Sequence, residues 1–194
     1  MDMFKRIADF LFELNEQKRS PRSGWQRIGI KSPESLAEHT AACAQIAYVL
    51  AAMEGANPDH AAALALFHDA SEVREGDHNW ITRIYRGTNG KAGAALAQIE
   101  GLPMSANLAA AFQELEDGKT KEAIVVHDAD FLDLALQAKV YEQSGCRSAL
   151  FFINGMRDSL KTDSAKKILA AIEQSNIQDW WLAIPEIAAV ADKN

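Results

Sequence analysis

The chain has 194 residues, 48% of them hydrophobic and 24% charged, which is the composition of a soluble globular protein with one substantial core. Its net charge of −7 argues against a nucleic acid partner, because such a partner requires a basic stripe. The sequence has no apolar run of membrane-spanning length, no secretion signal and only two cysteines, Cys43 and Cys146. We therefore expect a cytoplasmic protein that spans no membrane.

Helical signals fill the first half of the chain. Residues 1–20 have apolar residues at helical spacing. The next helix is predicted to start at Ser32-Pro33-Glu34-Ser35 and to stop at Glu54-Gly55. Asn57-Pro58-Asp59 caps a third helix, which we expect to continue to Gly76. A further helical stretch covers 79–85, and residues 87–90 read as a loop.

The second half continues the same pattern. Two short helices are predicted at 91–100 and 105–117, and a long, apolar, central helix at 122–143. Residues 147–160, 163–175 and 178–190 complete the bundle. Because no period-two pattern is bounded by turn residues, we expect one all-α domain over 1–194, a bundle of roughly eight to ten helices.

Polar residues in these apolar helices are the informative exceptions. Asp130, Asp133 and Gln137 share one face of the central helix, among apolar neighbours. A buried carboxylate is costly unless it is paired, hydrogen-bonded or bound to a metal. Taken alone, these residues are explained as well by a solvated helix face or by ion pairing.

Two other helices carry similar exceptions. His68 and Asp69 follow the apolar run at 64–67, and Glu72 comes one turn later. His39 lies among small apolar residues on the helix that precedes them. Each histidine alone is most simply a structural residue, so neither motif indicates a site by itself.

The combination changes the interpretation. His39, His68, Asp69 and Asp130 come from three helices in the order H…HD…D. Two imidazoles and two carboxylates suit one divalent transition ion (Mn²⁺, Co²⁺, Fe²⁺, Ni²⁺ or Zn²⁺) better than Ca²⁺, which prefers oxygen ligands. Such an ion can acidify water and polarise a phosphoryl oxygen.

The H…HD…D order resembles the HD-domain metal-dependent phosphohydrolases. Three segments extend the resemblance to the 5′-deoxynucleotidase branch of that family: KRSPRSGWQRIGIKSPESLAEHT (18–40), HDASEVREGD (68–77) and VVHDADFLDLALQA (125–138). The resemblance implies an HD-type helical fold, a homodimer, and hydrolysis of nucleoside 5′-monophosphates to nucleoside and phosphate.

The resemblance also implies roles for single residues. The four H…HD…D residues would hold the metal, with Asp130 rather than Asp128 as the last ligand, a choice that spacing alone leaves open. Glu72 would position or deprotonate the attacking water. Asp77 would lie near the sugar or the leaving oxygen.

The substrate contacts implied by the resemblance lie upstream of the first histidine. Arg22 would bind the 5′-phosphate through its forked guanidinium, and is preferred over Arg19 and Arg27. Trp25 would pack near the sugar and disfavour a 2′-hydroxyl. The segment HNWITRIYRG after Asp77 differs from better-known members of the branch and would line the base pocket.

Other functions fit parts of the same pattern. HD-domain proteins include cyclic-nucleotide and alarmone phosphodiesterases and dNTP hydrolases, but a short acidic chain with one arginine cluster better suits a monophosphate. A non-catalytic, metal-stabilised module would give Glu72 and Arg22 no reason to be present. His78 and His127 could form a second metal site, but we expect them to support the first site or to lie on the surface.

Overall fold

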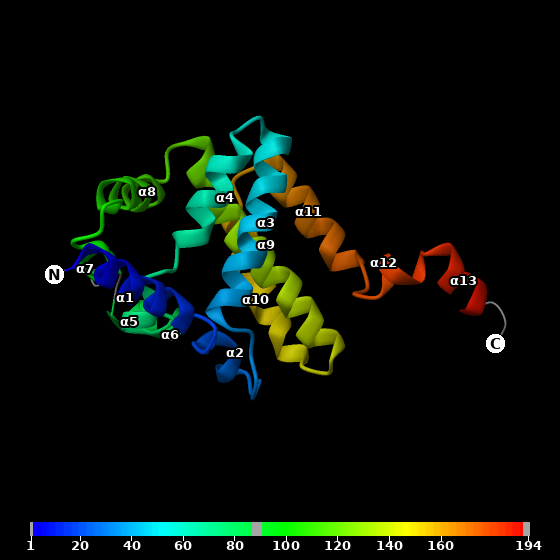
Figure 1. The fold of residues 1–194 in the computed structure, drawn as a ribbon. Coiled ribbons are helices and arrows are strands. Elements are labelled where there is room, and N and C mark those ends of the chain that lie inside the picture. Colours follow the sequence, from blue (N-terminus) through cyan, green and yellow to red (C-terminus); the bar gives the residue numbers. More distant parts are fainter. Residues whose placement is uncertain (1, 87–90, 192–194) are drawn as a thin grey trace.

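A computed structural model describes residues 2–86 and 91–191 of the chain (Figure 1). Over these ranges the regular structure is helical, with one isolated antiparallel bridge between Pro21 and Ser35. The all-α prediction is therefore confirmed. The loop predicted at 87–90 lies outside the described residues.

The elements follow one another closely along the chain. The helices before residues 87–90 are α1 (Met3–Glu16), α2 (Ser23–Arg27), α3 (Leu36–Glu54), α4 (Pro58–Phe67), α5 (Glu72–Glu75) and α6 (Trp80–Arg86). After them come α7 (Lys91–Ile99), α8 (Ser105–Asp117), α9 (Lys121–Gln143), α10 (Leu150–Met156), α11 (Asp163–Gln174), α12 (Asp179–Leu182) and α13 (Pro185–Ala191). Short 3₁₀ turns, Arg147–Ala149 and Arg157–Ser159, flank α10.

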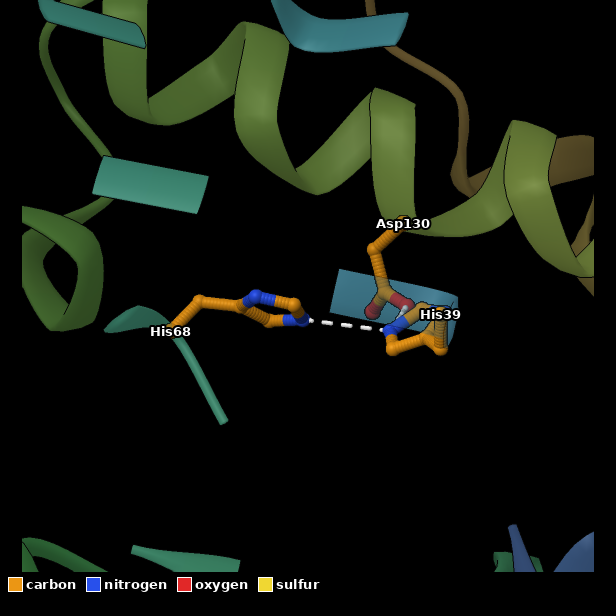
Figure 2. A group of neighbouring side chains, drawn as sticks. All are labelled: His39, His68 and Asp130. Atoms are coloured by element: carbon orange, nitrogen blue, oxygen red, sulfur yellow. Dashed lines mark hydrogen bonds and ion pairs between the residues drawn. The ribbon is translucent and has the colours of Figure 1, made fainter. Parts of the chain in front are cut away.

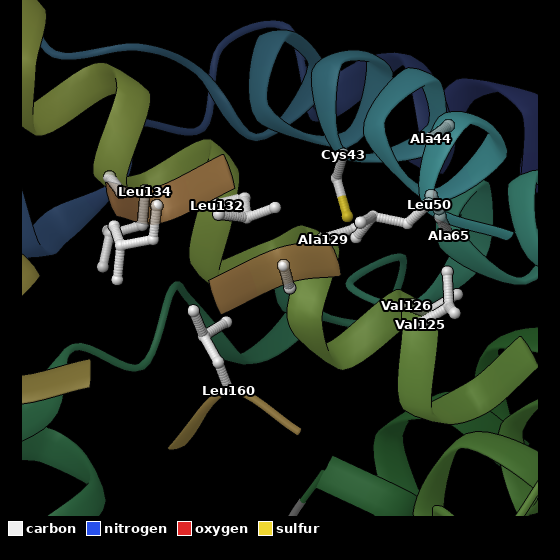
Figure 3. Packing of buried hydrophobic residues seen from close by; sticks show 14 of the residues in the cluster. Cys43, Ala44, Leu50, Ala65, Val125, Val126, Ala129, Leu132, Leu134 and Leu160 are labelled. Carbon is white, nitrogen blue, oxygen red and sulfur yellow. The ribbon is translucent and has the colours of Figure 1, made fainter. Parts of the chain in front are cut away.

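Helices α3, α4 and α9 form the centre of the molecule (Figure 1). Their buried faces combine small residues, such as Cys43 and Ala65, with branched ones such as Leu132 (Figure 3). Small side chains let helix backbones approach closely, and branched side chains fill the remaining space. The result is a packed core in which His39 lies on α3, Asp130 lies on α9, and His68 and Asp69 directly follow α4.

The start of α3 lies later than the sequence suggested. Ser35 is the N-cap residue, and it forms a capping box with Glu38. The residues before it are extended instead of helical, because Arg22 N–H donates to Glu34 O at 3.0 Å and Leu36 N–H donates to Ser20 O at 2.8 Å. These bonds hold the segment that contains Arg22 against the start of α3.

The helix predicted to continue to Gly76 stops at Phe67. Residues 68–71 form a turn in which Ala70 N–H donates to Phe67 O and Glu72 N–H to Asp69 O, both at 3.1 Å. The short helix α5 then begins at Glu72. The expected helical i, i+4 relation between His68 and Glu72 is therefore wrong, because the turn sets their relative position.

The C-terminal helices α12 and α13 project away from the bundle (Figure 1). They replace the single helix predicted for 178–190, and the break falls next to Pro185, whose ring disfavours helical geometry at the preceding residue. Among the residues described, no helix combines the length and the apolar character needed to cross a bilayer.

Candidate metal and phosphate site

Three of the predicted ligands converge at the centre of the bundle (Figure 2). His39 comes from α3, His68 from the end of α4, and Asp130 from the middle of α9. Nε2 of His39 lies 3.3 Å from Nε2 of His68 and 3.3 Å from Oδ1 of Asp130. One ligand atom from each residue thus faces the same small volume.

Asp69, the fourth predicted ligand, lies beside this group. Its Oδ2 lies 3.2 Å from Nε2 of His68 and 3.7 Å from Nε2 of His39. Atoms bound to one ion at about 2.0–2.2 Å lie about 3–3.5 Å from their neighbours around it. The spacing of these nitrogen and oxygen atoms therefore fits a divalent metal ion.

The opposite nitrogen of each imidazole is already bonded. Nδ1 of His39 donates to Oδ2 of Asp133 at 2.7 Å, and Nδ1 of His68 donates to Ala65 O at 2.7 Å. Such bonds fix the tautomer and leave Nε2 as the ligand atom, which is the usual arrangement around metal-binding histidines. Both rings are therefore oriented before an ion binds.

The structure separates the two candidate aspartates of α9. Asp128 is fully buried on another face, where it accepts hydrogen bonds from Lys161 N–H at 2.9 Å and Thr162 N–H at 2.7 Å. Asp130 faces His39 and His68. The preference for Asp130 is thus supported by geometry that sequence spacing alone did not provide.

Arg22 lies against the carboxylates of the cluster. One guanidinium nitrogen is 3.3 Å from Asp69 and 3.4 Å from Asp77, and another is 3.8 Å from Asp130. Burial alone would lower the pKa of Arg22, but the charges of these three aspartates raise it above its ordinary range. The side chain therefore supplies a permanent positive charge beside the cluster.

The same charges act on the proposed ligands. Burial and Arg22 would lower the pKa of His39, but hydrogen bonds with Asp130 and Asp133 raise it to about 10. Burial would raise the pKa of Asp130, whereas the bond to His39, and the charges of His39, His68 and Arg22, lower it. The half-buried Asp130 carboxylate is therefore held ionised beside the two histidines, where it can bind a cation.

The two predicted catalytic carboxylates lie near the two ends of α5: Glu72 is its first residue, and Asp77 comes two residues after its last. Glu72 is buried in its first turn, and its charge contributes to the raised pKa of Arg22. Asp77 follows α5; its Oδ2 accepts hydrogen bonds from the backbone N–H of Ser23 at 2.6 Å and from the Ser23 hydroxyl at 2.7 Å. Asp77 therefore ties the start of α2 to the site and holds Arg22 in place.

Trp25 is 1% exposed and touches the cluster only indirectly. Its Nε1–H donates to Glu34 at 2.8 Å, and its ring packs against Phe152 and Tyr141. Burial, followed by the charge of Asp133, raises the pKa of Glu34. These contacts hold the Trp25 ring in one position, three residues after Arg22 in the chain.

A cavity of about 400 Å³ opens beside Arg22 and Asp77, within the range of about 300–1,000 Å³ common for small-molecule sites. Its wall is mostly apolar and aromatic, and includes Trp25, Trp80 and Phe152. His78, Asn79, Arg83 and Ile84 also line it. The segment expected to line a base pocket thus borders this cavity.

The two extra histidines stand apart from the ligand groups found within 2–86 and 91–191. His78 lines the cavity, and the His127 ring bonds to Leu115 O at 3.0 Å. Three residues that hydrogen-bond to site residues were given no role in the site from the sequence: Asp133, Glu34 and Ser23. Of these, only Asp133 was noticed in the sequence, as a carboxylate on the same face of the central helix as Asp130.

Known proteins are similar to this chain over most of its length. The model of the HD domain family matches residues 14–172. The chain is 26% identical over 191 residues to 5′-deoxynucleotidase HDDC2 of Danio rerio, covering 89% of this chain and 95% of that protein. It is 30% identical over 142 residues to 5′-deoxynucleotidase HDDC2 of Bos taurus, covering 71% and 69%.

A solved structure shows the same architecture. It is a conserved hypothetical protein from Pyrococcus furiosus with a TM-score of 0.74 and 26% identity, and the match covers 87% of this chain and 99% of that one. The family match spans more than half of the sequence, and it includes every residue of the predicted site. The chain therefore belongs to the HD domain family.

Proposed function

We propose that this protein is a metal-dependent 5′-nucleotidase that hydrolyses deoxyribonucleoside 5′-monophosphates to nucleoside and phosphate. The observation that carries the proposal is the convergence of His39 and His68 with carboxylates, beside a buried arginine at the mouth of a nucleoside-sized cavity. The names of the Danio rerio and Bos taurus relatives support the deoxynucleotide substrate.

In this proposal His39, His68, Asp69 and Asp130 hold one divalent ion. The mixed nitrogen and oxygen donors favour Mn²⁺, Co²⁺, Fe²⁺, Ni²⁺ or Zn²⁺. When bound, such an ion supplies the positive charge that acidifies water and polarises a phosphoryl oxygen. The bonds from Nδ1 of both histidines keep the Nε2 atoms aimed at this position.

The remaining residues act on the substrate and on water. Arg22 donates to the phosphate oxygens and offsets their charge. The Glu72 carboxylate orients the attacking water for in-line displacement and accepts its proton. As the bond from phosphorus to the 5′-oxygen breaks, that oxygen takes a proton directly from solvent or, through Asp77, a solvent proton that this carboxylate has first taken up. Most of the rate acceleration comes from positioning and electrostatics, as in phosphoryl transfer generally.

In this proposal the sugar of the substrate lies against the cavity wall. Trp25 lies in this wall close to Arg22 in the chain, and its ring is held by Glu34 and Phe152. We propose that its rigid face leaves no room for a 2′-hydroxyl, so that deoxyribonucleotides are preferred. A flexible side chain at this position would yield and accept both sugars.

The domain organisation, assembly and location of the protein are also part of the proposal. We propose that residues 1–194 form one domain that acts as a cytoplasmic homodimer on a small-molecule substrate. The net charge of −7 makes nucleic acid and anionic membrane surfaces poor partners. The exposed apolar residues Trp180 and Leu182 on α12, and Ile184 just after it, support a contact between two copies.

The test is phosphate release from the eight common 5′-nucleoside monophosphates, ribo and deoxy, with Mn²⁺, Co²⁺, Mg²⁺ or EDTA. Release from the deoxy set that is stimulated by Mn²⁺ or Co²⁺ and stopped by EDTA is expected. Conversion only of cyclic nucleotides, alarmones or dNTPs, followed by chromatography of the nucleotide products because these reactions need not release inorganic phosphate, would assign a different phosphohydrolase activity. No release from any phosphate ester would favour a metal-stabilised binding module.

A further inference from the structure

Aromatic side chains form part of the cavity wall. Trp25 and Phe152 have ring centroids 4.7 Å apart. Phe152 neighbours Phe151 at 5.9 Å, and Phe151 neighbours Trp80 at 5.7 Å. This run connects α2, α10 and α6. Trp25, Phe152 and Trp80 all line the cavity, so one aromatic wall extends from the start of α2 to the start of α6.

Trp80 differs from the other members of this wall in its exposure. It is 44% exposed, whereas Trp25 is 1% exposed. A large apolar ring that is left open at the edge of a cavity gains free energy when a ligand covers it. Trp80 therefore provides an uncovered aromatic surface at the mouth of the cavity.

The absence of a side chain at Gly155 leaves room for the Trp80 ring. A Cβ atom added at Gly155 would lie 2.5 Å from Cη2 and from Cζ3 of Trp80, so any side chain at this position would displace the ring. The backbone at Gly155 does not require glycine, since it is absent from the glycines with positive φ. Glycine lowers the stability of a helix relative to alanine, so its presence in α10 is explained by the room it leaves for the indole.

Two polar side chains near Trp80 are already bonded. Asn79 donates from Nδ2 to the Ser23 hydroxyl oxygen at 2.9 Å, and its Oδ1 accepts from Thr82 N–H at 3.2 Å. The Asp77 carboxylate is engaged by Arg22 and Ser23. A nucleobase beside Trp80 would therefore meet ring faces, while Nε2 of His78, a buried atom with no hydrogen-bond partner among the described residues, offers a polar contact in the same cavity lining.

We propose that Trp80, seated on Gly155, is the surface on which the nucleobase of the substrate stacks. This inference rests on the proposed function, which puts the phosphate at Arg22 and directs the nucleoside into the same cavity. Every nucleobase has a π face, so stacking on an indole serves all of them. Trp80 then contributes to substrate binding and leaves the chemistry at phosphorus to the metal cluster.

The test compares a substrate that has a base with one that lacks it. Phosphate release is measured with the four deoxynucleoside 5′-monophosphates and with 2-deoxyribose 5-phosphate. Replacing Trp80 with Ala should raise KM for the nucleotides by about 5- to 100-fold, the usual range for a lost stacking partner, with kcat nearly unchanged. KM for 2-deoxyribose 5-phosphate should stay close to the wild-type value.

Three further variants sharpen the comparison. Trp80→Phe keeps a ring face and should recover part of the nucleotide affinity. Gly155→Ala keeps the indole but displaces it, and should also raise KM for nucleotides only; the atoms in conflict are at the tip of the Trp80 ring, so the ring can move and the fold persists. Trp180→Ala removes an exposed tryptophan on the distant helix α12 (Figure 1) and should leave the comparison unchanged.

Binding without turnover gives a second measurement. Equilibrium dialysis of labelled deoxyadenosine against the metal-free protein should show binding to the wild type and its loss in Trp80→Ala. If the wild type hydrolyses no phosphate ester but this difference persists, the proposed function fails and the stacking surface stands. Equal losses for both substrates, or wild-type nucleotide KM and deoxyadenosine binding in Trp80→Ala, would overturn the inference.

Discussion

At the scale of single residues, Asp133 shows how a side chain outside the ligand set can control it. Its carboxylate accepts from Nδ1 of His39, whose other nitrogen faces His68. Replacing Asp133 with Asn removes the charge that fixes the tautomer and orientation of the ring. We expect Mn²⁺ affinity to fall by about 10–100-fold, measured by isothermal titration calorimetry on metal-free protein.

Asp128 offers a matched control for this experiment, because it is a second buried carboxylate on the same helix. Asp128→Asn should bind Mn²⁺ with wild-type affinity, since its partners are Lys161 and Thr162. Unchanged affinity in Asp133→Asn would contradict the positioning role. A similar loss in both variants would point to a general effect on the fold of α9.

A substitution at Glu72 tests whether this residue acts in the chemical step without binding the metal. Replacement by Gln preserves its size but removes the base that takes a proton from water. We expect kcat to fall by about 10²–10⁴-fold, with metal content measured by atomic emission remaining at the wild-type level. Full turnover in Glu72→Gln would remove this residue from its proposed role, and loss of the metal would make it a ligand instead.

The sequence could identify these residues only up to a point. His39, His68, Asp69 and Asp130 were found because polar ligands interrupt apolar helices, a local feature. The choice of Asp130 over Asp128 required the resemblance, because both lie on one helix and only tertiary contacts separate them. Ser23 and Glu34 act through long-range hydrogen bonds that no local pattern encodes.

At the scale of elements, Asp128 joins α9 to the start of α11. It accepts from Lys161 N–H, Thr162 N–H and the Thr162 hydroxyl, the last two at 2.7 Å. Asp128→Ala leaves these donors without their charged acceptor in a buried setting, so unfolding free energy should fall by about 2–4 kcal/mol. Urea denaturation measures it; Asp163→Ala, at an exposed position, should cost less than about 1 kcal/mol. Equal stability of the two variants would contradict this account.

The elements themselves were largely predictable. Helix α8 covers the predicted 105–117, and α9 begins and ends within one residue of its predicted bounds, because caps and apolar periodicity are local signals. The turn at 68–71 was missed, since its hydrogen bonds replace a helix that the sequence alone would favour. The break before α13 was also missed, although Pro185 gave a signal for it.

At the scale of the whole molecule, the C-terminal helices raise the question of assembly. Trp180, Leu182 and Ile184 are exposed, Trp180 by 75%, and these helices extend beyond the bundle (Figure 1). If a second copy covers them, replacing Leu182 and Ile184 with Glu should convert a dimer into a monomer, because the charges resist burial. Light scattering coupled to size-exclusion chromatography measures the mass.

Phe12→Glu is the control, since Phe12 is an exposed apolar residue on a different helix, α1. It should leave the mass of the wild type unchanged. If the variant with Leu182 and Ile184 both replaced by Glu is still a dimer, the interface lies elsewhere. A wild-type protein that is monomeric at micromolar concentration would contradict the homodimer itself.

The central claim is that the H…HD…D cluster holds the ion on which phosphate release depends. The most direct measurement is phosphate release from dAMP by EDTA-treated protein before and after Mn²⁺ is restored, for the wild type and for Asp69→Ala. The account predicts that Mn²⁺ restores activity in the wild type, and that Asp69→Ala neither retains the metal nor releases phosphate. Full activity of metal-free Asp69→Ala would contradict it.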